Sequence, residues 1–330
     1  MKDSAYNQLN PLIRVREAEL LSHAQFEQLL AAKDMAAVTE LLRGTRYEQY
    51  AEGNLLANFN QVFKKEQEAM FQWLYQHAPD KRIIHIYSSR FTFHNLKVLT
   101  KAEINDMNLD HLLLPDGLYT KASLKSAVRT KKSNELPEFL LSAIHEVFDY
   151  LERARRRQGI DVIYDRLFLT YQRQLADDIG EPNLLEEVIS FIDFNNIGIL
   201  ARGILRGNTP TFLSTVLSSS GSIPKKELLE YAEGSLAALT EYVLNSKYGD
   251  MFQTILDSDS QKIDVLAIDR LRDDYLTKFY EKADTTAFGP LPLLAYLNSK
   301  EIEWKNLRLI LVGKVNHFSD AQIRERMRLV

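Results

Sequence analysis

Two short motifs in this chain come close to known catalytic patterns, and each lacks a residue that its chemistry requires. Gly313-Lys314 matches the end of a phosphate-binding loop, but Arg308 stands where the loop needs glycine and Val315 follows the lysine. His145-Glu146 matches the start of a zinc-protease motif, but Asp149 replaces its second histidine. The sequence therefore predicts no nucleotide loop and no protease zinc site of these kinds.

Acidic pairs and histidines are the other groups that could hold metal ions. Helical enzymes that act on diphosphates bind magnesium through aspartates one turn apart, and both Asp177-Asp178 and Asp273-Asp274 lack a third acid at that spacing. We interpret both pairs as solvated turns. The seven histidines have no ligand-like spacing and are interpreted as surface or packing residues: His23, His77, His85, His94, His111, His145 and His317. The chain has no cysteine for a disulfide, a thiolate zinc site or a nucleophile, so we predict no catalytic residue, metal or cofactor.

Arginines form the densest basic run of the chain, at the end of an expected helix. The run is Arg153, Arg155, Arg156 and Arg157. Two interpretations remain open: cations that favour a helix C-terminus ahead of Gly159, or a docking surface for an acidic protein or anionic lipid headgroups. Arg202 and Arg206 extend another expected helix, where they either line a polar surface or flank the core.

Composition limits the partners and the class of fold. The formal net charge is −4, which is too balanced for a general nucleic-acid binder. Residues 1–10 are polar, and no stretch approaches the roughly 20 apolar residues of a membrane-spanning helix, so we predict a soluble protein that is at most peripheral to a membrane. Only 13 glycines and 9 prolines occur in 330 residues, so turns are scarce and the elements must be long.

Apolar residues recur every three or four positions in several long stretches, as expected for helices that bury one face. These stretches are residues 55–77, 140–151 and 184–200. Ser22 with Gln25, and Asp34, are typical caps at the start of further helices. The alternation typical of a strand is nearly absent, and Arg82–Tyr87 is the only short candidate. The chain is therefore predicted to be all α.

Three segments share a repeat of the form aromatic, any residue, Asn, aliphatic, any residue, aliphatic, aliphatic. They are Phe93–Leu99, Phe194–Leu200 and Trp304–Ile310, centred on Asn95, Asn196 and Asn306. The asparagines are 101 and 110 residues apart, so the repeated unit is near one third of the chain and far longer than the repeats of helical solenoids. We predict that residues 1–330 form a single subunit of three similar helical modules around a pseudo-threefold axis.

Each repeat asparagine interrupts an otherwise apolar helix face. A buried amide without partners is costly, so we expect the three side chains to hydrogen-bond nearby backbone and fix helix register, not to catalyse. Beyond each repeat, Thr120, Pro224 and Ser319 are expected to begin a helix, each with an aliphatic residue four positions on. The repeat thus predicts a fold, not a reaction.

The C-terminal part of the chain carries a recognisable pattern. It runs from Gly289-Pro290-Leu291-Pro292 through a tyrosine-containing helix to Gly313-Lys314. The pattern resembles the C subunits of bacterial and archaeal V-type (A-type) ATPases, the counterparts of the d subunits of eukaryotic vacuolar ATPases. Its family positions fall on Pro290, Tyr296, Lys300, Glu301, Glu303, Asn306 and Arg308. Arg14-Val15-Arg16 and residues 41–47 resemble the family's opening, while Trp304 stands where an aliphatic residue is commoner.

The resemblance implies a single-copy, funnel-like, all-helical rotor subunit without catalytic groups or cofactors. In that family the subunit seats on the cytoplasmic side of the membrane-embedded proteolipid ring and receives the central shaft, which is made of the D and F subunits. It is peripheral to the membrane and passes rotation between ATP turnover and proton or sodium transport. Such a chain is expected to be a monomer when isolated, and its work requires stiffness and tight seating.

Two other function classes remain as alternatives. The run from Arg153 to Arg157 would suit a freestanding helical adaptor for acidic partners. The acidic pair Asp273-Asp274 would suit a metal-dependent all-helical enzyme, which would bind a divalent ion in stoichiometric amount. Whole-length resemblance and the threefold repeat favour the rotor subunit over both.

Overall fold

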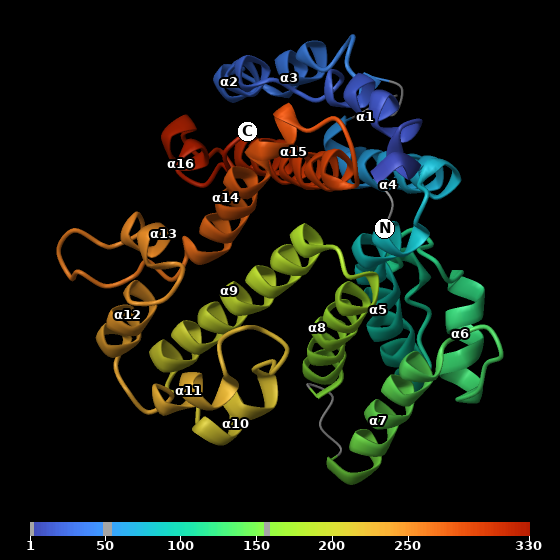
Figure 1. Cartoon of the computed structure of the whole chain (residues 1–330), viewed down its shortest axis with the longest axis vertical. Helices are drawn as coiled ribbons and strands as arrows, with labels where there is room; N and C mark the ends of the chain where they lie inside the picture. Colours follow the sequence, from blue (N-terminus) through green and yellow to red (C-terminus); the bar gives the residue numbers. More distant parts are fainter. Residues whose placement is uncertain (1–2, 49–54, 155–158) are drawn as a thin grey trace. The chain divides into compact units, whose positions relative to one another are not determined.

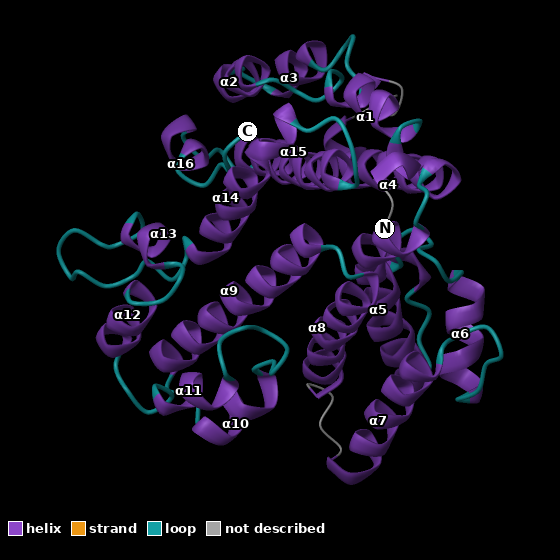
Figure 2. Cartoon of the chain, viewed as in Figure 1, coloured by secondary structure: helices purple, strands orange, loops and turns teal. Residues whose placement is uncertain are grey.

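The computed structural model describes residues 3–48, 55–154 and 159–330, without the side chains of residues 55–58 and 154 (Figure 1). All regular elements in these residues are helices, and an isolated bridge pairs Leu256 with Ile263 (Figure 2). The predicted all-α fold is therefore confirmed. Backbone contacts divide the chain into two compact units, residues 1–79 with 247–330 (unit 1) and residues 80–246 (unit 2). The division into three modules stays a prediction.

Unit 1 is built around one long helix, α15 (Leu291–Val315). The other elements of this unit are η1 (Asp3–Tyr6), α1 (Leu9–Glu17), α2 (His23–Ala31), α3 (Met35–Leu41), α4 (Leu55–His77), α13 (Gly249–Gln253), α14 (Ile268–Tyr280), η4 (Glu281–Thr285) and α16 (Asp320–Arg324). Most α15 side chains are buried, because the helix packs against α1 to α4, α14, η4 and α16. A helix that is surrounded in this way has no polar face, so its periodicity in the sequence is weak.

Unit 2 has α8 (Gly159–Ile179) in contact with three other long helices. These are α5 (Lys81–Asn105), α7 (Glu138–Ala154) and α9 (Pro182–Arg206). The remaining elements are η3 (Asp110–Leu112), α6 (Lys121–Thr130), α10 (Pro210–Val216), α11 (Lys225–Glu230) and α12 (Leu236–Leu244). Aromatic and aliphatic side chains of α5, α6, α7 and α8 share one core, which includes Phe93, Leu124, Ile144 and Tyr164.

Side-chain caps begin several helices where the sequence predicts them. The Ser22 hydroxyl accepts a hydrogen bond from the Gln25 N–H, and the Gln25 side chain accepts one from the Ser22 N–H. The Asp34 carboxylate accepts from the Ala37 N–H at the start of α3. The strand candidate Arg82–Tyr87 is wrong, because these residues open α5. Residues 83–89 are all buried, which removes the polar positions that would have revealed a helical period.

The central helix of the repeat, α9, is long and strongly apolar. By length and composition it is apolar enough to cross a membrane, although no such stretch is expected from the sequence. In the most apolar part of α9, 61% of the residues are buried inside the structure, as in the core helix of a soluble protein. Its buried small residues include Gly198, Ala201 and Gly203, and at Gly203 the Leu213 side chain of α10 packs closely against the helix.

Candidate functional site

The three repeat asparagines make the same two hydrogen bonds in three different helices. In each case the side-chain oxygen accepts from a backbone N–H about twenty residues later, and the side-chain nitrogen donates to the carbonyl of that same residue. The N–H···O and N···O=C distances are 2.8 and 3.2 Å for Asn95 with Leu114, 2.9 and 2.8 Å for Asn196 with Ser218, and 2.9 and 3.0 Å for Asn306 with Arg328. We call these paired bonds the asparagine clasps. The expected bonding of each amide to nearby backbone is present.

The helices that carry the clasps, α5, α9 and α15, also end alike. Eleven residues after each asparagine the backbone turns left-handed, with φ of 50° at Asp106, 65° at Gly207 and 57° at His317. The next N–H then returns to a carbonyl seven residues after the asparagine, at 2.9–3.0 Å. These bonds run from Met107 to Ala102, from Asn208 to Gly203 and from Phe318 to Gly313.

Small residues at those carbonyl positions let the following chain pack closely. A Cβ added to Gly203 would lie 2.5 Å from the Leu213 side chain, and one added to Gly313 would lie 2.7 Å from Ile323. Leu213 and Ile323 are each ten residues beyond their glycine. Sequence reasoning missed this part of the repeat, although a small residue seven positions after each asparagine was its visible signal.

The helix starts beyond the repeats need one correction. Thr120, Pro224 and Ser319 do begin helices α6, α11 and α16, as expected. By position, however, Ser319 corresponds to Thr209, since both cap a short helix thirteen residues after the asparagine. Asn108 occupies that position in the first repeat and accepts a hydrogen bond from the Asp110 N–H. Ser, Thr, Asp and Asn are all common caps, so residue type alone did not identify the equivalent cap, whereas the spacing of thirteen residues does.

The family motif contributes a buried charged cluster to unit 1. The Lys300 ammonium has no exposed surface and lies 2.5 Å from Glu303 Oε2 and 3.0 Å from Glu66 Oε1. Glu303 also accepts hydrogen bonds from the Leu21 N–H and the Tyr47 hydroxyl, both at 2.7 Å. One ion pair on α15 therefore joins the loop before α2, the segment after α3, and α4. We call Lys300, Glu303, Glu66 and Tyr47 the charged hub.

Electrostatics keep the Lys300 ammonium charged in spite of its burial. Burial alone would lower the pKa of Lys300, but the carboxylates of Glu303 and Glu66 outweigh burial and hold that pKa above its ordinary value. Burial and the same two carboxylates raise the pKa of the Tyr47 hydroxyl well above its ordinary range. The hub can therefore fix the positions of helices. Its tyrosine keeps its proton near neutral pH and so cannot serve as an acid or a base.

The other family positions lie at different depths along α15. Pro290 precedes the first residue of the helix, Tyr296 is buried, Glu301 is half-buried and Arg308 is exposed. Lys314 donates to the carbonyls of Leu30 at 2.6 Å and Ala32 at 2.5 Å, which supports the end of α2. The lysine whose neighbours partly match a phosphate-loop pattern thus serves as a helix cap.

The acidic pair Asp273-Asp274 is a correction to the sequence interpretation. Asp273 is not in a solvated turn but in α14, with a side chain only 3% exposed. Three cations surround its carboxylate, Lys305 at 2.9 Å, Arg272 at 3.0 Å and Arg328 at 3.1 Å. Burial would raise the pKa of Asp273, but these cations outweigh it and lower that pKa. The pair Asp177-Asp178 is exposed at the end of α8, where Asp177 contacts Arg173 at 3.0 Å.

Among the seven histidines, His85 is the one that is buried. Its Nε2 lies 2.8 Å from the Tyr171 hydroxyl, and its ring packs edge-on against Tyr119 and Tyr171. Burial lowers the pKa of His85 from 6.5 to about 4. His94 is half-buried on α5, and the other five are exposed.

We expect His85 to make the subunit sensitive to acid. The unfolded chain binds a proton at His85 near pH 6.5 and the folded chain only near pH 4, so its contribution to stability is complete above pH 6.5 and is lost as the pH falls toward 4. Between pH 7.5 and 5 the loss should be about 2 kcal/mol. Urea unfolding at both values should show that loss in the wild type and a smaller one in His85→Phe. An equal loss in both proteins would exclude His85 as its source.

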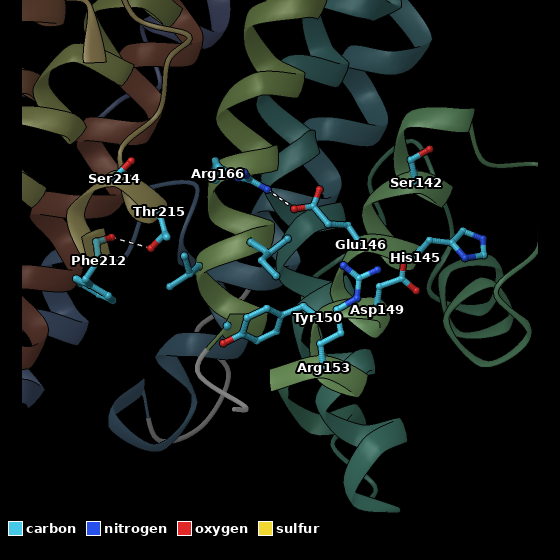
Figure 3. A pocket seen from close by; sticks show the side chains of 13 residues that line it. Ser142, His145, Glu146, Asp149, Tyr150, Arg153, Arg166, Phe212, Ser214 and Thr215 are labelled. Atoms are coloured by element: carbon cyan, nitrogen blue, oxygen red, sulfur yellow. Dashed lines mark hydrogen bonds and ion pairs between the residues drawn. The ribbon is translucent and has the colours of Figure 1, made fainter. Parts of the chain in front are cut away.

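Unit 2 contains an open groove of about 920 Å³ (Figure 3). It is lined by one face of α7, by α8 and by α10. Glu146 of α7 pairs with Arg166 of α8 across its floor, and Phe212 of α10 is 46% exposed at its edge. In the described part of the chain, Asp149 and Arg153 on α7 have no hydrogen-bond or ion-pair partner. The groove is thus a mixed polar and apolar surface.

Of the candidate arginines that the structure describes, Arg153, Arg202 and Arg206, one lies in this groove. Arg153 lines it, whereas Arg155, Arg156 and Arg157 lie outside the described residues. Arg202 is half-buried along α9 and Arg206 is exposed near its end, and neither lines the groove. Phe93, Phe194 and Trp304, the aromatics of the repeat, are all buried.

Comparison with known proteins confirms the family resemblance that the sequence indicates. The model of the ATP synthase (C/AC39) subunit family matches residues 9–326. The C subunit of the V-type sodium ATPase of Enterococcus hirae is 49% identical over 325 residues, which cover 98% of both chains. The C subunit of the A-type ATP synthase of Methanocaldococcus jannaschii is 22% identical over 97% of this chain and 85% of its own, and that of Thermococcus kodakarensis is 24% identical over 94% and 87%. The family is one of structural subunits, not of catalytic ones, and this chain belongs to it.

Proposed function

We propose that this chain is the central-rotor subunit that couples the shaft, made of the D and F subunits, to the membrane proteolipid ring of a rotary ATPase. The observation that carries the proposal is family membership over almost the whole length, with 49% identity to the C subunit of a V-type sodium ATPase. The protein would sit on the cytoplasmic side of the membrane as a peripheral component in one copy. It would transmit torque for ATP-linked proton or sodium transport without chemistry of its own.

Mechanical coupling requires a framework that deforms little, and the described residues supply one. The three asparagine clasps tie the C-terminal halves of long helices to the chain that follows them. The charged hub joins α15 to the loop before α2 and to the segment after α3 through buried contacts of 2.5–2.7 Å. Close-packed interiors transmit strain with little compression. The repetition of the clasp also supports the proposed funnel of three modules.

The proposal is tested by reconstitution. The purified chain should bind the complex of the D and F subunits and, in detergent, the proteolipid ring, and it should be required for the two to be captured together. Binding to neither partner would reject the proposed function. A mixture that lacks this chain is the control for direct contact between shaft and ring.

Charge reversal in the arginine run should weaken seating without unfolding the subunit. We expect Arg153→Glu, combined with Arg155→Glu and Arg156→Glu, to lower affinity for the shaft or the ring about tenfold at low salt, because steering and orientation depend on charge complementarity. Arg129→Glu, which reverses an exposed cation at the end of α6, is the matched control. Calorimetric titration and circular dichroism of each variant would measure both properties. Unchanged affinity would remove this run from the interface.

A further inference from the structure

α4 is held to its neighbours in an unusual way. It packs against α3 and α15, and Glu66 is the charged residue at the centre of its buried face. Glu66 has no exposed surface and contacts Lys300 at 3.0 Å and Arg46 at 3.8 Å. Neither of its carboxylate oxygens makes a hydrogen bond to any residue that the structure describes. The attachment of Glu66 is therefore electrostatic, without the directional bonds that hold Glu303.

Other polar groups along the same stretch of α15 also lack partners. Tyr296 and Trp304 lie one turn before and one turn after Lys300. The Tyr296 hydroxyl and the Trp304 indole N–H are buried, and neither has a hydrogen-bond partner within the described residues. Each such group costs free energy, because it has lost water without gaining a protein partner. The buried stretch of α15 around Lys300 thus contributes less to the stability of the fold than its burial alone would suggest.

The side of α4 that faces α1 is incompletely filled. A cavity of about 350 Å³ lies there, lined by Leu12, Val15 and Arg16 of α1 together with Trp73 of α4 and two charged residues, Glu19 and Arg46. Across it the Arg16 guanidinium stacks on the Trp73 ring at 3.7 Å. Leu12 and Val15 are 43% and 62% exposed, so this pocket is open to water and α4 buries little apolar surface against α1 there. This cation–π contact bridges the gap without closing it.

We propose that α4 separates from α15 and α1 as one unit, in an opening that leaves the rest of unit 1 folded. Regions with missing partners and low contact density open with smaller free energies than the core of a domain. α15 is held more tightly than α4 despite its own unpartnered groups, since it packs against several helices and Glu303 adds hydrogen bonds to the loop before α2 and the segment after α3. Residues 78–80 lead directly from α4 into α5 of unit 2. Such an opening therefore releases one of the two chain connections between the units. The inference does not depend on the proposed function.

Hydrogen–deuterium exchange of the isolated full chain tests the proposal. In the wild type, amides of residues 59–77 should exchange at least tenfold faster than those in the interior of α15. Glu66→Gln removes the charge with little change of shape and should accelerate exchange in residues 59–77 by a further tenfold, while α14 and α15 keep their wild-type rates. Glu68→Gln, an exposed position on the same helix, should change neither. Equal protection of α4 and α15 in the wild type, or equal acceleration of both in Glu66→Gln, would overturn the proposal.

Discussion

Lys300→Met should destabilise the isolated subunit by about 3–5 kcal/mol, the range found when one partner of a buried ion pair is removed. The change leaves the carboxylates of Glu303 and Glu66 close together, buried and without their shared cation. Urea unfolding at pH 7 followed by circular dichroism would measure the loss. Arg308→Ala, an exposed change on the same helix, should stay within about 0.5 kcal/mol.

A second substitution separates the charge effect from a general effect of altering the core. Lys300→Met combined with Glu303→Gln should be less destabilising than the sum of the two single changes, because the double variant no longer buries the unpaired Glu303 carboxylate. Strict additivity would mean that the two side chains do not act as a pair. A loss below about 1 kcal/mol in Lys300→Met would show that its ammonium is not essential to the cluster.

Asn196→Leu should cost about 4 kcal/mol, since it leaves a buried N–H and a buried carbonyl of Ser218 without partners. Ser218 has no exposed surface, so water cannot replace the lost bonds. The equivalent changes Asn95→Leu and Asn306→Leu should cost only about 1–2 kcal/mol, because the partner backbones there are partly exposed.

The order of the three losses is the critical result. In thermal and urea unfolding, Asn196→Leu should have a clearly lower melting temperature and free energy of unfolding than the other two variants. Asn195→Ala, at the half-buried neighbouring position, controls for a general loss of α9 stability. Three equal losses would mean that exposure of the partner backbone does not decide the effect.

The sequence predicts the helices best where one face is buried and the other is wet. The stretch from Leu55 to His77 shows this period clearly, and α4 has those bounds. Arg82–Tyr87 shows none, because α5 is covered on all sides there. A helical period is visible in a sequence only where an apolar face alternates with a polar one, so it is weak in helices that are buried on all sides.

The site was accessible to sequence reasoning only in part. Resemblance and repetition identify Lys300, Glu303 and the asparagines, but not their partners. Glu66 left one local signal, since it stands among Val62, Phe63 and Met70 on the apolar face of α4. Tyr47 ends the segment that resembles the family's opening, but nothing local links Tyr47 or the Leu21 N–H to Glu303, because they meet it only through tertiary folding across more than 250 residues.

The ends of α5, α9 and α15 share one backbone conformation but not one amino acid. The left-handed residue is an aspartate, a glycine and a histidine, respectively. Only glycine adopts that conformation without a steric penalty, so the other two residues retain it against their own preference. The backbone conformation at these three helix ends is therefore preserved although the side chains there differ. If the three segments share a common ancestor, their backbone torsion angles would still show it where their amino-acid identities no longer do.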